Sequence, residues 1–272
     1  MVTARWLGAA GVELLRGDDI ILIDPYLSRS RKFEVFFTHL KPKKPHIRAY
    51  LTGIQGTVRA VIVGHTHFDH ALDIPELAGT FTCTVYGSRS MKTLLSLSGL
   101  PSLGRVCTPH ESIALFEEAR LTMLPSRHGL VFLGRVPYRG EIDPGLPVPL
   151  RAHQYRLGDM MMPVTRFGDI TFVHAGSANW IESEVDIHSC DVLFMCVPGW
   201  KKSPSYTREF LDRLRPSVII PFHYDDFTTE LRRGTEPPVL PFVDRKGFER
   251  SIRSTLPRVE VLWLKPYLPA RF

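Results

Sequence analysis

The stretch HTHFDH, His65 to His70, places three histidines and an aspartate within six residues. It follows directly on the apolar run AVIVG at 60–64, which is typical of a short buried strand. The residues after it, DHALDIPELA, read as the start of a helix. An apolar core cannot hold so many polar groups without partners, so the motif needs an explanation in a strand-to-helix loop.

The spacing of these four side chains predicts a metal site. In an extended chain, side chains two apart point the same way, so His65 and His67 are expected to converge on one point. As the chain turns into the helix, Asp69 and His70 are expected to aim at a neighbouring point. Imidazole and carboxylate are the ligands that zinc, iron and manganese take from proteins.

One loop rarely supplies a complete ligand set, and two later histidines stand where strands are expected to end. His128 closes LTMLPSRH and His223 closes SVIIPFH. Both are therefore predicted to complete three-ligand coordination around one or two ions. His174, within the strand-like ITFVHA, is expected to bond to a neighbour. Five further histidines have no ligand spacing and are expected to be ordinary: His39, His46, His110, His153 and His188.

Strand patterns outnumber helical patterns along the chain, and neither a linker nor an internal repeat divides it. These features favour one mixed α/β domain over residues 1–272, with layered sheets. Two segments interrupt the pattern. Residues 129–166 are rich in proline and glycine, and so long a loop predicts a substrate-covering insertion.

The second segment is a basic loop at residues 28–50. Seven lysines and arginines there face only Glu34. The loop is either simply solvated or attracts an anionic substrate or a membrane surface. Phe33, Phe36 and Phe37, together with Met160–Met162, either form an apolar wall over the metals or pack against their own domain.

Composition excludes several classes of protein. The formal charge of +6 and pI near 9.2 are mildly basic, and we find no nucleic-acid-binding module, so no nucleic-acid partner is expected. No apolar run approaches the roughly 18 residues of a membrane span. The four cysteines lie in or beside strand-like stretches without Cys-x-x-Cys spacing, which indicates buried thiols and a reducing, cytoplasmic compartment. A small-molecule substrate is expected, and a homo-oligomer is compatible with the sequence.

HTHFDH resembles the H-x-H-x-D-H signature of the metallo-β-lactamase-fold metal-dependent hydrolases. The opening WLGAAGVELLRGDDIILIDPYL is similar to the start of the L-ascorbate-6-phosphate lactonase-like branch of that superfamily, where a strand ending in Asp-Pro precedes the metal loop. The resemblance covers most of the chain except the two interrupting segments. It implies a four-layer αβ/βα sandwich with the metals along one edge of the two sheets.

The resemblance also implies the ligand sets. By motif, His65, His67 and His128 would bind a first metal, and Asp69, His70 and His223 a second. Asp24, at the end of ILIDP, matches an aspartate that orients the imidazoles from behind, although Asp-Pro is also a common turn start.

One position departs from the family pattern. Where dinuclear members carry an aspartate that bridges the two ions, ITFVHAGSANW places Ser177. Serine is a poorer ligand than carboxylate and removes a negative charge, so the number of ions is open. Zn²⁺ is the expected metal, with Mn²⁺ or Fe²⁺ as alternatives.

A divalent metal lowers the pKa of bound water from 15.7 to about 7, which makes hydroxide available at neutral pH. The expected reaction is attack of this hydroxide on an ester, lactone or amide of a small molecule, with Asp69 as the catalytic residue that orients the water or accepts its proton. A phosphodiesterase or phospholipase-type hydrolase is the alternative, favoured by the basic loop. A non-hydrolytic iron protein or an inactive relative is the alternative of another class, favoured by Ser177.

Overall fold

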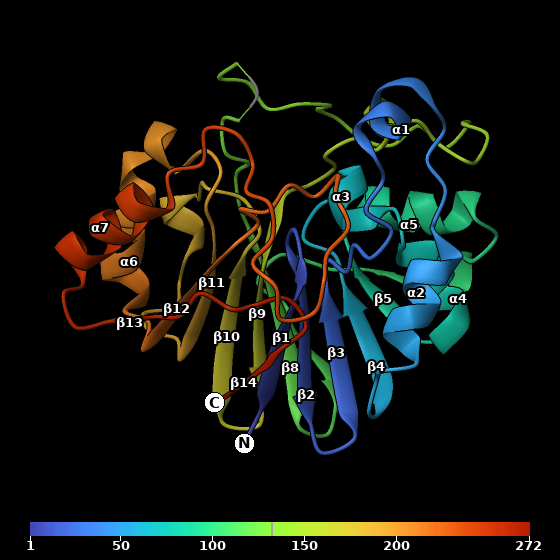
Figure 1. The fold of residues 1–272 in the computed structure, drawn as a ribbon. Coiled ribbons are helices and arrows are strands. Elements are labelled where there is room, and N and C mark those ends of the chain that lie inside the picture. Colours follow the sequence, from blue (N-terminus) through green and yellow to red (C-terminus); the bar gives the residue numbers. More distant parts are fainter. Residues whose placement is uncertain (132) are drawn as a thin grey trace.

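In the computed structural model, two sheets face each other and helices cover their outer sides (Figure 1). The structure is described for residues 1–131 and 133–272. The first seven-stranded sheet comprises β14 (Pro269–Arg271), β1 (Thr3–Gly8), β2 (Gly11–Arg16), β3 (Asp19–Ile23), β4 (Thr57–Ile62), β5 (Thr84–Gly87) and β6 (Gly104–Val106), in that order. The second comprises β13 (Glu260–Val261), β12 (Val218–Phe222), β11 (Val192–Cys196), β10 (Ile170–Ala175), β9 (Met161–Phe167), β8 (Ala119–Pro125) and β7 (Ser112–Phe116).

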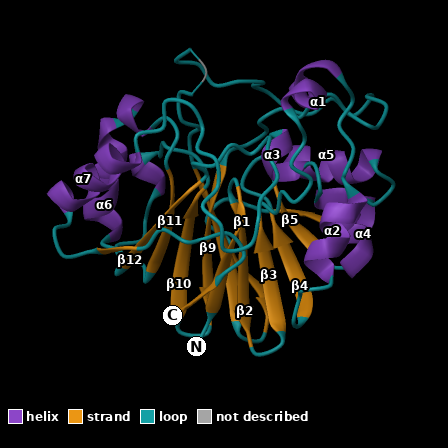
Figure 2. Cartoon of the chain, viewed as in Figure 1, coloured by secondary structure: helices purple, strands orange, loops and turns teal. Residues whose placement is uncertain are grey.

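The helices form the two outer layers (Figure 2). The side of the first sheet carries α1 (Lys32–Phe37), α2 (Lys44–Leu51), α3 (Phe68–Ala71), α4 (Ile74–Phe81) and α5 (Arg89–Leu97). The side of the second sheet carries α6 (Glu209–Leu214) and α7 (Arg245–Thr255). This arrangement confirms the predicted αβ/βα sandwich. Among the described residues, none of the helices combines the length and the apolar character needed to cross a membrane.

Strand β3 explains why the layers assemble. Ile21 and Ile23 lie in the apolar core between the sheets, whereas Ile20 and Leu22 pack beneath the helices of the first sheet. All four are fully buried, as the two-residue period of a strand covered on both faces requires. Each contributes about 1.5–3 kcal/mol relative to an exposed side chain.

Strand direction decides where the site lies. β3 and β4 are parallel, and β10, β11 and β12 are parallel in the other sheet. β8 is antiparallel to β9, which is antiparallel to β10, so β8 runs in the same direction as β10. The loops that follow β3, β4, β8, β10 and β12 therefore meet at one edge of the sandwich.

Several local expectations agree with the structure. The β2–β3 hairpin turns at Gly17, whose φ of 55° favours glycine. Helix α5 begins after Ser88, whose hydroxyl accepts from the Met91 amide, and the chain leaves it through Gly99 at φ 77°.

The two segments that interrupt the sequence pattern contain more regular structure than expected. The basic loop at 28–50 includes α1 and α2, and residues 161–166 belong to β9. β9 pairs with both β8 and β10, so Met161 and Met162 are buried in the core rather than over the metal site. Of the two alternatives that the sequence left open for these methionines, the structure shows packing against their own domain, because an uninterrupted apolar run suits a strand covered on both faces.

Candidate metal centre

The loops at the carboxyl edge bring the predicted site residues together. Asp24 follows β3, and His65–His70 lie between β4 and α3. His128, Ser177 and His223 follow β8, β10 and β12 respectively. Segments separated by more than a hundred residues thus meet because their strands end at the same edge.

Within this edge the polar atoms form two adjoining clusters. The ligand atoms of His65, His67 and His128 all lie within 4.8 Å of one another, and those of Asp69, His70 and His223 do the same. Asp24, His65 and His70 satisfy the same limit, which joins the two clusters. All of these residues are buried except His128, which is half-buried.

In the first cluster, the outer nitrogens of two rings are held by backbone carbonyls. His67 Nε2 lies 3.1 Å from the carbonyl oxygen of Pro137, and His128 Nδ1 lies 2.8 Å from that of Gly129. A neutral imidazole that donates to a carbonyl keeps its other nitrogen unprotonated. These contacts therefore leave Nδ1 of His67 and Nε2 of His128 free to coordinate an ion.

In the second cluster, two imidazole nitrogens and one carboxylate oxygen lie close together. His223 Nε2 lies 3.3 Å from His70 Nε2 and 3.3 Å from Asp69 Oδ2. His70 Nδ1 donates to Asp24 Oδ2 at 2.8 Å, so neutral His70 turns an unprotonated Nε2 toward His223 and Asp69. Two nitrogens and a carboxylate oxygen pointing at one place are a suitable donor set for a divalent cation.

His65 gives the strongest indication that the residues fit a metal ion. Its side chain is 1% exposed, and neither ring nitrogen has a hydrogen-bond partner in the described part of the chain. A buried polar group left unsatisfied costs about 1–3 kcal/mol. Its ring centroid lies 3.7 Å from that of His70 and 5.1 Å from that of His128, between the two clusters.

The two clusters differ in the pKa values of their side chains when no metal is bound. Burial lowers the pKa of His65 well below its usual value, that of His67 to about 3 and that of His128 to about 4. Burial also opposes the charge of His70, but the carboxylates of Asp24 and Asp69 outweigh it and raise the pKa of His70. Burial alone would raise the pKa of Asp69, yet the imidazoles of His70 and His223 lower it. The first cluster thus offers neutral nitrogens, and the second offers an ionised carboxylate.

Asp24 holds two parts of the site with one side chain. Its Oδ1 accepts from the Gly64 amide at 2.7 Å, immediately before the metal motif, and its Oδ2 accepts from His70. The residue is fully buried and adopts φ 45°, a left-handed conformation that aspartate tolerates better than most residues. The contact to His70 is the kind of support expected for Asp24 from the sequence.

Ser177 lies at the site but serves another contact. Its hydroxyl oxygen accepts from the Gly129 amide at 2.9 Å, next to His128. His174 lies 4.0 Å from Asp24 through Nδ1 and donates from Nε2 to the carbonyl of Ala10 at 2.8 Å, the neighbour bond expected of it. His110 pairs with Glu184 and Asp186 at the surface.

Sequence reasoning missed the part played by Pro137. Its carbonyl, in the segment after His128, fixes the ring of His67. Tyr138 follows it, and its ring centroid lies 6.2 Å from that of His67. A backbone carbonyl carries no sequence signal, so only the fold could identify this partner.

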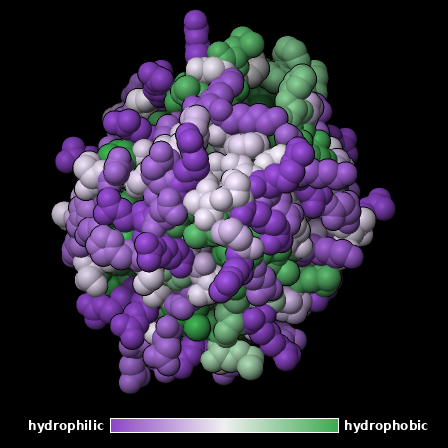
Figure 3. Space-filling model, turned by 90° about the vertical axis from the view of Figure 1, so that its left-hand side faces the viewer, coloured by the Kyte–Doolittle hydropathy of each residue, from purple (hydrophilic) through white to green (hydrophobic). Residues whose placement is uncertain are grey.

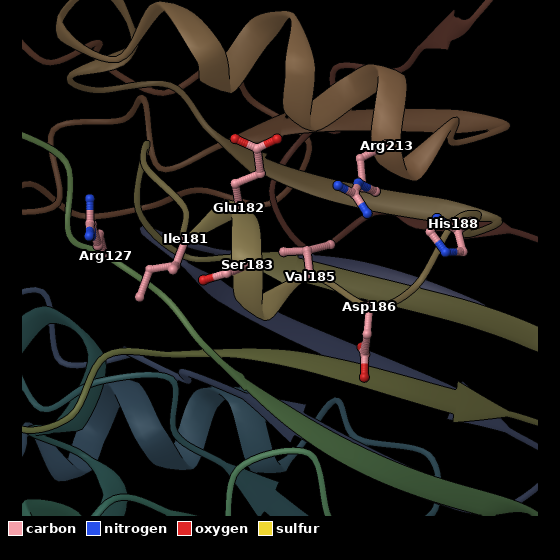
Figure 4. A pocket seen from close by; sticks show the side chains of 8 residues that line it. All are labelled: Arg127, Ile181, Glu182, Ser183, Val185, Asp186, His188 and Arg213. Atoms are coloured by element: carbon pink, nitrogen blue, oxygen red, sulfur yellow. The ribbon is translucent and has the colours of Figure 1, made fainter.

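Figure 4 shows the residues that line a cavity of about 770 Å³. Arg127, which precedes His128, is at one end, and charges of both signs line the rest. None of the residues that line it is a predicted ligand: Arg127, Ile181, Glu182, Ser183, Val185, Asp186, His188 and Arg213.

Comparison with known proteins finds a relative at low sequence identity. No protein-family model matches the chain. A UPF0173 metal-dependent hydrolase of Polaromonas sp. strain JS666 is 25% identical over 247 residues, covering 85% of this chain and 79% of the relative.

Solved structures show the same fold at low identity. Igni18, a metallo hydrolase of the archaeon Ignicoccus hospitalis, matches with a TM-score of 0.65 and 16% identity over 99% of this chain and 97% of its own. An isothiocyanate hydrolase from Delia radicum gut bacteria matches with a TM-score of 0.60 and 16% identity. The match covers 100% of this chain and 99% of that protein. CmlA, a diiron β-hydroxylase of Streptomyces venezuelae, matches with a TM-score of 0.62 and 16% identity. The match covers all of this chain but only 54% of CmlA.

These findings confirm the resemblance to metal-dependent hydrolases of the metallo-β-lactamase fold. The chain is thus similar in sequence to a metal-dependent hydrolase and similar in fold to a metallo hydrolase. The bond that it cleaves is a separate question.

Proposed function

We propose that this chain hydrolyses an ester, lactone or amide bond of a small molecule at a centre holding one or two Zn²⁺ ions. The proposed ligands are His65, His67 and His128 for the first ion and Asp69, His70 and His223 for the second. The observation that carries the proposal concerns buried His65, whose two ring nitrogens have no hydrogen-bond partner among the described residues. Ligand atoms of four other residues, His67, His128, Asp24 and His70, lie within 4.8 Å of its own.

Metal bound there would polarise the scissile group and supply an acidic water. The chain contributes the rest. Asp69, kept ionised by its imidazole neighbours, is placed to hold or accept a proton at Oδ2, the atom 3.3 Å from His223 Nε2. Asp24 keeps the proton of His70 on Nδ1, on the side away from the cluster.

We assign the covering role to residues 129–160. This segment begins at Gly129, which Ser177 holds, and its Pro137 carbonyl contacts His67. A segment that covers the site and contacts a candidate metal ligand would exclude bulk water from the place where the reacting bond would lie. The four cysteines are all free and buried, which supports assignment to a reducing, cytoplasmic compartment.

Phosphodiester hydrolysis is the second proposal, supported by one observation. Lys32 of the basic segment pairs with Asp226, three residues after His223, with Nζ 3.1 Å from Oδ2. Basic side chains therefore border the metal site, where an anionic substrate would benefit from them.

Metal content and turnover test the proposal together. Elemental analysis of protein purified without added metal should give one or two equivalents of zinc. Turnover should be faster on a carboxylic ester or lactone than on bis(p-nitrophenyl) phosphate, and the reverse order would establish the second proposal. A coloured, iron-containing protein inactive on both classes would favour oxidative chemistry instead.

Replacing one buried histidine tests the site itself. His65→Ala should lose zinc and activity, while the surface variant His110→Ala keeps both. Because His65 is buried, thermal unfolding of both variants should accompany the assay, so that loss of metal is separated from loss of fold. A folded His65→Ala protein with full metal content and activity would refute the assignment.

A further inference from the structure

Helix α1 presents an apolar surface to solvent beside the metal site. Phe33, Phe36 and Phe37 are 67%, 69% and 66% exposed, and α1 has no buried residue. The rings contact one another, with centroids 5.3 Å apart for Phe33 and Phe37 and 6.3 Å apart for Phe36 and Phe37. Three adjacent exposed phenylalanines on a six-residue helix are a costly surface unless something covers them.

The helix protrudes from the end of the molecule at which the site lies. In Figure 1, α1 stands above α3 and beyond the carboxyl ends of the strands, opposite the chain termini. Figure 3 shows hydrophobic side chains gathered at this same end. The ion pair between Lys32 and Asp226 fixes α1 to the loop that carries His223.

Basic residues lie on both sides of α1 in the sequence. Residues 28–50 contain seven of them, and four are paired with acidic side chains: Arg29 with Asp225, Lys32 with Asp226, Lys43 with Glu34 and Lys44 with Glu76. Arg31 and Lys41 are exposed and form no ion pair within the described part of the chain. The surface thus combines protruding aromatic side chains with unneutralised cationic groups.

This combination selects among the partners that would cover the patch. A symmetric pair of chains docked through α1 would bring two like-charged surfaces together, which opposes a second copy of this chain. An anionic lipid surface attracts the basic side chains and accepts the phenylalanines into its interface. We propose that α1 and the neighbouring basic side chains dock this protein on the surface of an anionic lipid bilayer, with the metal site facing the membrane.

Vesicle binding tests the proposal without reference to catalysis. The intact protein should co-sediment with phosphatidylcholine vesicles that contain phosphatidylserine and much less with phosphatidylcholine alone. The triple variant Phe33→Ser, Phe36→Ser, Phe37→Ser should bind about a hundredfold more weakly. Arg31→Gln with Lys41→Gln should weaken binding about fivefold for each charge removed.

Two controls separate docking from damage. Leu268→Ser changes an exposed apolar residue next to β14, outside the basic segment at 28–50, and should leave vesicle binding unchanged. The triple serine variant should keep its unfolding midpoint and its turnover of a water-soluble ester, because its targets are two-thirds exposed and outside the site. Phe36→Trp should keep binding, and its added fluorescence should shift to the blue with anionic vesicles.

Three results would overturn the proposal. Intact protein that stays in solution with anionic vesicles at low salt lacks the predicted surface. Equal binding of the triple variant would place the contact elsewhere. A dimer of the intact protein that the triple variant converts to monomer would identify α1 as a contact between copies. Since none of these readouts depends on turnover, the docking surface and the proposed hydrolysis can fail separately.

Discussion

Asp24→Asn is the most informative single change at this site. Asparagine has the same shape and also tolerates the left-handed backbone at φ 45°, so the fold should survive. Its amide oxygen can still accept from Gly64, but its amide nitrogen cannot accept from His70 Nδ1. His70 then loses the bond that directs its unprotonated Nε2 toward Asp69 and His223.

The magnitude follows from the bond that is lost. A hydrogen bond to a charged partner contributes about 1.5–3 kcal/mol, which corresponds to roughly ten- to a hundredfold in affinity. The same range is typical when the carboxylate behind a metal-binding histidine is removed. We therefore expect zinc to bind about ten- to a hundredfold more weakly at the second cluster, with the first cluster little changed.

Competition with a chromophoric chelator measures this loss. Wild type and Asp24→Asn are titrated with zinc, and the number and affinity of the bound equivalents are compared. Asp73→Asn is the matched control, because Asp73 is equally buried but accepts from the Leu27 and Ser28 amides. It should lower stability and leave zinc affinity unchanged. Wild-type affinity in Asp24→Asn, or an equal loss in Asp73→Asn, would refute the argument.

Two further predictions concern the apo site and Ser177. Burial lowers the pKa of His67 to about 3 and of His128 to about 4, whereas unfolded histidine titrates near ~6.5. Below pH ~6.5 these two histidines therefore bind protons in the unfolded chain but stay neutral in the folded chain. The free energy of unfolding of chelator-treated protein should fall by up to about 3 kcal/mol per histidine by pH ~4. Urea unfolding across this window checks the effect, and a flat profile contradicts it. Ser177→Ala should lower the free energy of unfolding by about 1–3 kcal/mol, because the buried Gly129 amide loses its acceptor, while elemental analysis finds unchanged metal. Loss of metal would make Ser177 a ligand.

The clustering of the candidate ligands was predictable because most of them follow a local pattern in the sequence. HTHFDH carries four donors in one loop, and His128 and His223 each close a strand pattern. Strands that run in the same direction bring such loops to one edge, so placing the strands places the ligands. Asp24 was recognisable by the same rule, as the residue that follows β3.

The remaining contacts depend on backbone geometry that residue types do not encode. Pro137 acts through its carbonyl, and any residue at that position would offer the same group. The helices at 32–37 and 44–51 were missed because basic and proline-rich composition resembles a solvated loop. The strand at 161–167 was missed because a run of methionines shows no alternation, although both faces of that strand are buried.

Serine in place of aspartate at position 177 removes a negative charge from the site and leaves its nitrogen ligands the same. The first cluster has three imidazoles, whose pKa values burial lowers, and no carboxylate. The second has Asp69 as a ligand and Asp24 behind His70, so both carboxylates of the site act there. A bridging aspartate would have shared its charge between two ions, whereas here the negative charge lies on one side. A cation in the first cluster would keep most of its charge for polarising a substrate, and one in the second would be largely neutralised by the protein. We therefore expect a cation bound in the first cluster to polarise a substrate more strongly than a cation bound in the second.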